Sequence, residues 1–462
     1  MPHQTLPLGQ KNLPRPLSLR RLIGPSFIIL GLGLGSGEII LWPYLTSNYG
    51  LGIVWGILVG ITMQFFINME VERYALINGE SIFVGFARLL KFLPFWFILS
   101  TFFGFGWPGI GLAGAHLIGN AVGVTNYNLV GIILFIAIGL ILTLGKVLYQ
   151  TVERLEIILI GVGVPFILIL TWYLAESADF AALAQGLIGR GEGFHFLPTG
   201  IILGTFLAAL AYSGAGGNLN LSQSFYVRDK GYGMGKYANR ITSLFTDRVD
   251  SKKISLTGNT FPLTKNNLAN YRRWWRVINL EHFLVFWCLG LITMLTLSLL
   301  AYITVHGLTG NTESINFVIN EAAVIGQKTL PLIGVLFLVL TGIMLTATQL
   351  SVLDSTSRII TENILLASNK LVTNVPRVYY WVLWVQIIFG IAVFTIGFDE
   401  PRVLIILSAI INAGTMFVYT GLLLWLNNSL LKKPLRPRFW RNTALVATFL
   451  FFGVLVSMVL FR

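Results

Sequence analysis

The sequence consists largely of long apolar runs separated by short polar segments. Each run is long enough to cross the hydrocarbon core of a bilayer, which is about 30 Å thick and needs about 20 helical residues. Charged residues make up only 11% of the 462 residues, whereas a soluble domain carries about 25%. The strands of a transmembrane β-barrel alternate apolar and polar residues. Because these runs are continuously apolar, they exclude such a barrel. The chain is predicted to be an all-α integral membrane protein with eleven spans, centred near residues 35, 58, 107, 137, 166, 212, 290, 344, 387, 414 and 450.

The net charge and the cysteine count limit which binding partners and which disulfide or metal chemistry the chain can have. We interpret the net charge of +13 as basic loops beside the anionic leaflet of a lipid bilayer, and we expect no nucleic-acid partner. The only cysteine, Cys288, lies in an apolar run, so a disulfide within the chain is impossible and a cysteine-based metal site is not expected. The first apolar run is too long for a signal peptide, so it should remain as the first helix.

The distribution of lysine and arginine predicts the orientation. A cytoplasmic N-terminus places almost all of the 32 lysines and arginines on the cytoplasmic side, as the positive-inside rule requires. The exceptions are Arg190, Lys328, Arg402 and Arg462. We therefore expect a multi-pass protein of a bacterial-type plasma membrane, with the N-terminus in the cytoplasm and the C-terminus outside.

Two spans are interrupted by glycines at corresponding places in the two halves of the chain. Residues 31–38 read Gly-Leu-Gly-Leu-Gly-Ser-Gly-Glu, and residues 213–218 read Ser-Gly-Ala-Gly-Gly-Asn. Such a pair of breaks points to the substrate site of a transporter, because unwound backbone is tolerated at membrane depth only where it is buried or lines a cavity. Close helix packing through Gly31 and Gly35 is the alternative, but it leaves the other glycines unexplained. The predicted substrate-binding residues are Gly35, Ser36, Gly37, Glu38, Ala215, Gly216, Gly217 and Asn218.

The number of spans predicts an inverted repeat. Five spans precede the helix with the second break, and five more begin with it. Because five is odd, the two units lie in opposite orientations, which is the plan of LeuT-like transporters. We expect one membrane domain, 1–462, with discontinuous first and sixth helices that meet at mid-membrane. Its predicted parts are a first repeat at about 20–177, a second at about 198–428, an extra helix at about 441–461, and a partly helical cytoplasmic linker at about 228–276.

Two polar residues beside the breaks allow two interpretations each. Glu38 is either a cation ligand or proton carrier, since intramembrane acids are functional by default, or a carboxylate that caps the resumed helix. If the cargo is a metal ion, Glu38 is the predicted metal ligand. Asn218 is either a ligand or a helix cap. The sequence does not decide between these interpretations.

Other polar residues are candidates for coupling or gating. Asp354 and Arg358 are four residues apart and can pair on one helix face, which favours a structural ion pair. A lone histidine among apolar neighbours, such as His116, is usually a hydrogen-bonded core residue, although proton relays also use histidines. The other candidates stand near predicted cytoplasmic helix ends: Arg154, Glu156, Glu281 and His282.

Motifs for enzyme chemistry are missing from the sequence. It contains no Walker A loop, no His-Glu-x-x-His, no Gly-x-Ser-x-Gly and no Cys-x-x-Cys. We therefore expect a secondary transporter that is not an enzyme and needs no cofactor. Its partners would be a small ion or solute and a coupling ion, H⁺ or Na⁺, as in symport.

Short motifs along the chain resemble the Nramp family of proton-coupled divalent metal transporters. Gly24-Pro25-Ser26-Phe27 is similar to the family's Gly-Pro-Gly-Phe, and Arg73 to Gly79 is similar to its Arg-Leu-Gly-Val-Val-Thr-Gly. Arg154-Leu155-Glu156 resembles the family's Arg-Lys-Leu-Glu, and Asn218-Leu219 resembles the Asn-Leu that follows its Met-Pro-His. Leu280-Glu281-His282 resembles its Ile-Glu-Ser, and Ile359 to Glu362 resembles the end of its eighth helix. The order of these matches implies a divergent Nramp-type carrier with a LeuT-like fold.

The metal ligands of that family do not carry over. Gly35-Ser36-Gly37-Glu38 replaces Asp-Pro-Gly-Asn, and Ala215-Gly216-Gly217 replaces Met-Pro-His. Loss of the thioether argues against Mn²⁺ or Fe²⁺ as cargo. Glu38 with backbone carbonyls and water still suits a hard cation, and the glycines leave room for an organic solute or an anion at the half-helix N-termini. Transport of a divalent metal ion or another small solute is expected. The alternatives are a carrier of a non-metal organic solute or anion and a non-transporting sensor or scaffold.

Overall fold

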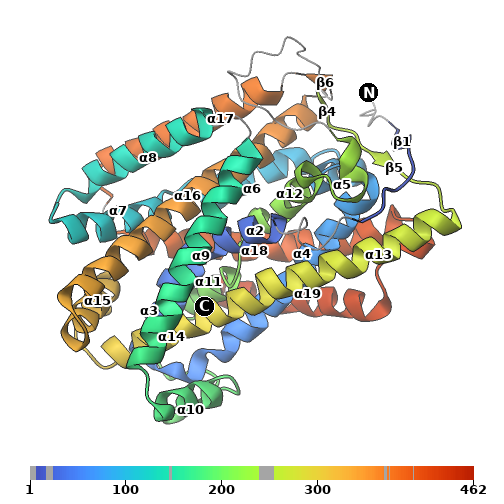
Figure 1. Ribbon diagram of the computed structural model, residues 1–462. Helices are drawn as coiled ribbons and strands as arrows, with labels where there is room; N and C mark the ends of the chain where they lie inside the picture. The colour runs from blue at the N-terminus through green and yellow to red at the C-terminus, as the bar shows by residue number, and fades with distance from the viewer. Residues whose placement is uncertain are drawn as a thin grey trace.

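The computed structural model describes residues 7–16, 24–144, 148–238, 254–368, 372–373, 375–398 and 400–461. Its helices pack into one elongated bundle (Figure 1). Ten helical stretches of these residues are long and apolar enough to cross a membrane: Pro25–Tyr49, Leu51–Asn78, Leu93–Val122, Tyr127–Leu144, Val152–Leu174, Lys265–Val305, Pro331–Ala367, Val375–Thr395, Pro401–Ser429 and Phe439–Leu460. They correspond to ten of the eleven predicted spans. The sixth predicted span falls on two shorter helices.

The first half of the chain contains the first five spans and the helices that connect them. Its helices are α2 (Pro25–Gly33), a π-helical segment (Leu34–Leu41), α3 (Trp42–Tyr49), a 3₁₀ turn (Leu51–Ile53), α4 (Trp55–Asn78), α5 (Ile82–Leu89), α6 (Leu93–Phe105), α7 (Gly109–Val122), α8 (Tyr127–Leu144), α9 (Leu148–Leu174) and α10 (Ser177–Gly186). The third span is interrupted between α6 and α7, where Pro108 lacks the N–H that a continuous helix needs.

The second half begins with the sixth span. Its helices are α11 (Leu203–Ala211), a 3₁₀ segment (Gly217–Ser222), α12 (Gln223–Lys230), a 3₁₀ turn (Gly233–Tyr237), α13 (Lys265–His282), a π-helical segment (Phe283–Leu289), α14 (Gly290–Val305), α15 (Asn316–Lys328), α16 (Pro331–Ala367), α17 (Val375–Thr395), α18 (Pro401–Ser429), a 3₁₀ turn (Lys433–Leu435) and α19 (Phe439–Leu460). The helical end of the predicted linker is α13. Residues 239–253 of that linker, and Arg462, lie outside the described residues.

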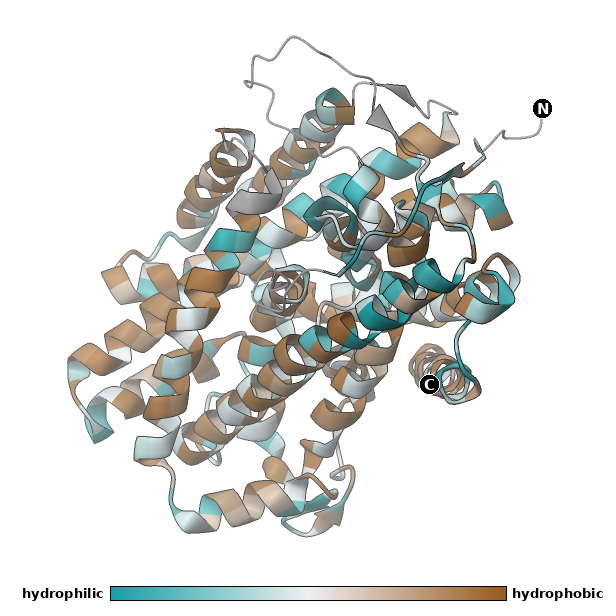
Figure 2. Ribbon diagram, turned by 45° about the vertical axis from the view of Figure 1, so that its right-hand side comes forward, coloured by the Kyte–Doolittle hydropathy of each residue, from teal (hydrophilic) through white to brown (hydrophobic). Residues whose placement is uncertain are grey.

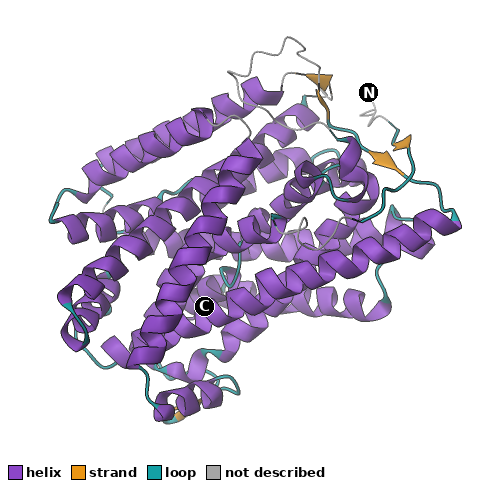
Figure 3. Cartoon of the chain, viewed as in Figure 1, coloured by secondary structure: helices purple, strands orange, loops and turns teal. Residues whose placement is uncertain are grey.

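Strands are short in the described residues (Figure 3). Strand β1 (Gly9–Gln10) pairs in parallel with β5 (Asn259–Thr260), β2 (Arg190–Gly191) pairs antiparallel with β3 (Phe194–His195), and β4 (Ile254–Ser255) pairs antiparallel with β6 (Val372–Thr373). The β1–β5 pair holds the N-terminal segment beside the residues that precede α13. The Trp274 indole strengthens this contact by donating to the Pro14 carbonyl at 2.8 Å.

Large apolar side chains lie on the outside of the bundle, whose helices are hydrophobic along most of their length (Figure 2). Large side chains such as Ile169, Trp172 and Ile388 are more than half exposed. A monomeric soluble protein rarely exposes contiguous apolar area of this kind, whereas lipid tails cover it in a bilayer. The protein is therefore an integral multi-pass membrane protein, as the sequence predicts.

The first glycine-rich segment differs from its prediction. Gly35 and Gly37 are not unwound, because the first span continues from α2 through the π-helical segment into α3. The Trp42 N–H bonds to the Gly37 carbonyl, so the wider turn keeps its backbone groups paired within the helix. Pairing matters here, since an unpaired backbone group at membrane depth costs several kcal/mol. The prediction of an unwound first helix is therefore wrong, and the segment is deformed instead.

The second glycine-rich segment interrupts the sixth span as predicted. Regular helix ends at Ala211, and α12 begins only at Gln223. Gly216 and Gly217 have φ angles of 72° and 45°, which lie in the left-handed region that side chains disfavour and glycine adopts freely. This break separates α11 from α12.

Candidate functional site

The two glycine-rich segments contact each other through their backbones. A Cβ atom added to Gly33 would lie 2.9 Å from the carbonyl carbon of Gly214, and one added to Gly37 would collide with the carbonyl oxygen of Tyr212. Only residues without a side chain fit this contact. The expected meeting of the first and sixth spans at their glycines is therefore present in the structure.

A glutamine of the second span satisfies the backbone groups freed by the break. The Gly216 N–H donates to Gln64 Oε1 at 3.0 Å. Gln64 Nε2 donates to the Ala211 carbonyl at 3.0 Å and more weakly to that of Leu210 at 3.4 Å. Gln64 is fully buried on α4. Its amide thus takes the place of the helix hydrogen bonds that the break removes.

Asparagines hold the other side of the break. Asn412 Nδ2 of α18 donates to the Tyr212 hydroxyl at 3.0 Å and to the Gly104 carbonyl at 2.8 Å. Asn218 Nδ2 donates to Ser100 Oγ at 2.9 Å and Thr101 Oγ1 at 2.8 Å on α6. Asn218 therefore binds the third span in this structure. Neither Gln64 nor Asn412 was predicted, because each lies in an apolar span away from the two glycine-rich segments, and a single nearby glycine (Gly60 or Gly414) does not indicate a break.

A small cavity lies next to the break. Its volume is about 10 Å³, close to the minimum for one water molecule. Tyr212, Gln349 and Ser408 give it polar groups, and its remaining walls come from Phe105, Trp107, Gly109, Ile110, Val352 and Ile405. The third, sixth, eighth and tenth spans meet there. None of the described residues that line it is acidic.

Glu38 lies at the first segment but faces another helix. Its Oε1 atom lies 3.8 Å from the position of a Cβ atom on Gly290 of α14, where Leu30 and Ile61 side chains also gather. Glu38 is fully buried, and neither carboxylate oxygen has a hydrogen-bond partner among the described residues. The helix-cap interpretation fails, because the helix is continuous there and the carboxylate bonds to no backbone N–H of the described chain.

A second buried carboxylate, Glu156 of α9, packs against the first span. A Cβ atom on Gly31 would collide with this carboxylate, and Ser351 of α16 donates a hydrogen bond to it. Thr348, one helical turn earlier, donates to the Gly31 carbonyl at 2.9 Å. Glu156 therefore lies where the fifth, eighth and first spans meet. Arg154, two residues away, is exposed.

A polar cluster joins the start of the first span to the seventh. Ser26 Oγ lies 2.5 Å from Glu281 Oε2 and 2.8 Å from His282 Nδ1. His282 Nδ1 is 3.7 Å from Glu72 Oε1, and Gln223 of α12 donates to Glu72. All five residues are buried. The structure places the candidates Glu281 and His282 around Ser26 of α2 and adds partners from α4 and α12.

Asp354 and Arg358 form the predicted ion pair within a larger network. Arg358 Nε lies 2.9 Å from Asp354 Oδ1, and Arg358 Nη1 lies 2.6 Å from Asp229 Oδ2. Arg228 bridges Asp229 at 3.1 Å and Glu362 at 3.2 Å. This network connects the end of α12 to α16. Sequence spacing predicted only the pair within α16, because it gives no sign of which distant helix packs against it.

The corner between α4 and α5 holds a carboxylate outside the membrane spans. Glu80 accepts hydrogen bonds from Tyr74 at 2.6 Å, from Arg88 at 2.9 Å and from the Gly258 N–H at 3.1 Å. Burial raises the pKa of the Glu80 carboxyl, and the Arg88 guanidinium opposes this rise. These bonds attach residues just before α13 to the second span.

The remaining sequence candidates form no metal centre. His116 lies in the middle of α7 and packs against Tyr127, with ring centroids 4.2 Å apart, and so stands apart from the break. Among the residues that the structure describes, no three His, Cys, Asp or Glu side chains gather as a metal site would require.

Comparisons with known proteins identify the fold. No protein family model and no curated protein matches the chain. A mutant of the Eremococcus coleocola manganese transporter matches 98% of this chain and 89% of its own, with a TM-score of 0.70 at 14% identity. The same transporter in complex with an aromatic bis-isothiourea substituted compound also has a TM-score of 0.70 at 14% identity. This match covers 98% of the present chain and 90% of the transporter chain. MhsT in complex with L-phenylalanine matches 94% of this chain and 97% of its own, with a TM-score of 0.52 at 14% identity.

The chain has a LeuT-like fold. Of the two proteins, the manganese transporter has the more similar arrangement of helices, with a TM-score of 0.70 against 0.52. The LeuT-like fold confirms the predicted class of all-α membrane protein. At 14% identity, the likeness concerns the arrangement of the helices and not the groups that bind cargo.

Proposed function

We propose that the protein is a secondary active transporter, related to the Nramp family, that moves a small polar solute past the break in the sixth span. The observation that carries this proposal is the broken backbone between α11 and α12, held by Gln64 and packed against the glycines of the first span. A scaffold would gain stability by losing such a break, since glycine in a helix costs about 1 kcal/mol. A transporter uses it as a binding site.

The lining of the central cavity favours an uncharged polar cargo. Tyr212, Gln349 and Ser408 offer hydroxyl and amide groups without a carboxylate, whereas Mg²⁺ and Ca²⁺ bind mainly carboxylate and carbonyl oxygens. The cavity has room for at most one water, so a larger cargo would enter only when the surrounding spans separate. The predicted substrate residues Gly35 to Gly37 and Ala215 to Gly217 would supply backbone groups.

A divalent metal ion is the second candidate, favoured by the likeness to a manganese transporter. In that case Glu38 would be the charged ligand. The thioether that favours softer transition metals is replaced by Ala215, so Mn²⁺, Fe²⁺ and Cd²⁺ should be poor cargo.

Glu38 is the proposed coupling residue. A buried carboxylate without an opposite charge costs several kcal/mol, so at this depth it requires a bound proton or cation. The apolar side chains of Leu30 and Ile61 gather beside this carboxylate at Gly290, which favours a proton over Na⁺, a cation that needs several oxygen ligands. Loading and release of this proton would accompany the movement of the first span against α14.

Uptake by proteoliposomes tests both proposals. A melting-shift screen of the purified protein over metals, amino acids and small anions first selects the cargo. Glu38→Gln keeps the shape of the side chain but cannot carry the proton, so we expect a folded protein whose uptake no longer responds to external pH between about 5 and 8. The exposed Glu313→Gln serves as the matched control. Wild-type uptake by Glu38→Gln across that range would refute the coupling role.

We also propose the orientation with a cytoplasmic N-terminus and an external C-terminus, in a bacterial-type plasma membrane, on the positive-inside rule. In a Cys288→Ser background, an impermeant thiol reagent added outside should label Thr309→Cys, between α14 and α15, but not Lys265→Cys at the start of α13. Both positions are exposed. The reverse pattern would invalidate the orientation.

A further inference from the structure

A large basic pocket opens at the end of the bundle that contains the start of α13. Its volume is about 610 Å³, and it lies between α13, the turn Lys433–Leu435 and the first residues of α19. Arg73 and Arg441 form its inner wall. Five more cations surround its mouth: Arg272, Arg276, Lys433, Arg436 and Arg438. No part of the proposed transport cycle uses this pocket.

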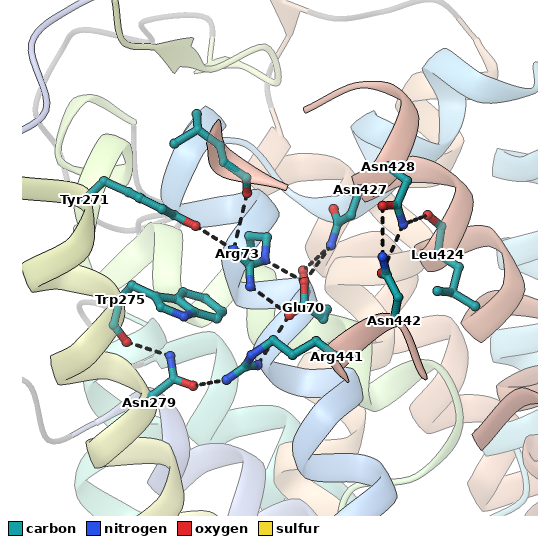
Figure 4. Close-up of polar contacts among 11 residues, drawn as sticks. Glu70, Arg73, Tyr271, Trp275, Asn279, Leu424, Asn427, Asn428, Arg441 and Asn442 are labelled. Carbon is teal, nitrogen blue, oxygen red and sulfur yellow. Dashed lines mark hydrogen bonds and ion pairs between the residues drawn. The ribbon is translucent and has the colours of Figure 1, made fainter. Parts of the chain in front are cut away.

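The inner wall is fixed by one buried carboxylate. Arg73 Nε lies 2.6 Å from Glu70 Oε2, and Arg441 Nη1 lies 3.3 Å from Glu70 Oε1 (Figure 4). Tyr271 accepts a hydrogen bond from Arg73 at 2.7 Å. Both guanidinium groups also lie against the Trp275 ring, 3.9 and 4.8 Å from its centroid. This wall is therefore preorganised, with one of its two positive charges neutralised by Glu70.

The cations at the mouth are not neutralised in the same way. None of these five residues forms an ion pair with a carboxylate within the described part of the chain. Arg436 uses its Nε to donate to the Leu431 carbonyl at 2.8 Å, which leaves its charge uncompensated. Arg272 and Arg276 are four residues apart, so they lie on one face of α13. The pocket therefore presents a concentrated positive field to an anion.

Apolar side chains continue from the mouth along both helices. Phe439 is 87% exposed and Trp440 50% exposed at the start of α19, and aromatic residues of this kind mark the headgroup level of a membrane. Exposed Val446 and Leu450 follow on α19, and Leu280 follows α13 beyond the pocket. A ligand with an anionic head and hydrocarbon tails fits this basic pocket with its adjoining apolar faces better than a free anion does.

We propose that this pocket binds the headgroup of an anionic phospholipid. Its phosphate would lie between Arg272 and Arg276 on one side and Lys433 and Arg438 on the other, because arginine forks match phosphate oxygens in pairs. The acyl chains would lie along the exposed apolar faces of α13 and α19. The volume is within the range of small-molecule sites, and basic pockets between membrane helices are known headgroup sites. The bound lipid would hold α13 and α19 together at the membrane surface.

Lipid-dependent melting of the full-length purified protein tests the site. The probes are phosphatidylglycerol, phosphatidylcholine with the same acyl chains, and inorganic phosphate, each added to protein in a neutral detergent. The test variant is Arg272→Gln/Arg276→Gln/Lys433→Gln, whose three side chains are exposed and outside the Glu70 wall. The matched control, Lys265→Gln/Arg273→Gln/Lys432→Gln, removes the same charge from the same segments outside the pocket.

We expect phosphatidylglycerol to raise the melting temperature of wild type and control, and phosphatidylcholine to have little effect. A basic residue contributes about fivefold to the affinity for an anionic surface, so three should weaken binding by roughly a hundredfold. The test variant should then need far more phosphatidylglycerol for the same shift. Equal losses in test and control variants would overturn the proposal in favour of diffuse charge attraction. A full shift with inorganic phosphate alone would overturn the lipid in favour of a free anion.

Discussion

Replacing Gln64 by leucine tests whether the break in the sixth span depends on one amide side chain. Gln64 accepts from the Gly216 N–H and donates to the Ala211 carbonyl, both at 3.0 Å. Leucine has a similar size and fills the same buried space, but it offers neither a donor nor an acceptor. Two backbone groups of the break would therefore lose their partner within the described structure.

The magnitude follows from these two contacts. A buried polar group left without a partner costs about 1–3 kcal/mol, so two such groups cost about 2–6 kcal/mol. The third contact, at 3.4 Å to the Leu210 carbonyl, is too long to add much. We expect Gln64→Leu to lower the unfolding midpoint clearly. Uptake should also fall in the fraction that remains folded, because the unpaired segment would rearrange toward a continuous helix.

Thermal unfolding of the detergent-purified protein and uptake by proteoliposomes measure the two effects. Gln386→Leu is the matched control, since Gln386 is also buried but bonds to the hydroxyls of Thr356 and Ser357, away from the break. Thr356 keeps a second bond to the Val352 carbonyl, so this control should lose less stability and retain uptake. An unfolding midpoint of Gln64→Leu equal to that of wild type would refute the reasoning.

Two further substitutions test the packing around the site. Gly37→Ala places a Cβ against the Tyr212 carbonyl oxygen, so it should abolish uptake and lower the melting temperature. At Gly161 an added Cβ has nothing within 4 Å, so Gly161→Ala should leave uptake unchanged and add up to about 1 kcal/mol of stability. Equal behaviour of these two variants would contradict the contact between the spans. Asp229→Asn removes one of the two carboxylates around Arg358. Breaking a buried pair costs about 3–5 kcal/mol, and a melting curve that does not move would show that the network is not structural.

The sequence by itself determined the membrane class, the positions of the spans and the break in the sixth span. Apolar length is a local property that only a membrane helix satisfies, and the positive φ angles of Gly216 and Gly217 are available to glycine alone at low cost. Contact between the two glycine-rich segments was also predictable, because the absence of side chains allows the backbones to approach. The Asp354–Arg358 pair followed from helical spacing.

The tertiary structure decided where these elements direct their side chains. Glu38 faces α14 instead of the break, because the π-helical segment rotates the residues that follow Gly33. Spacing along one helix cannot reveal such a rotation. Gln64 and Asn412 complete the break from other spans, and no pattern near either residue marks them. Local sequence fixes where a backbone needs partners, whereas only the packing of distant helices determines which side chains provide them.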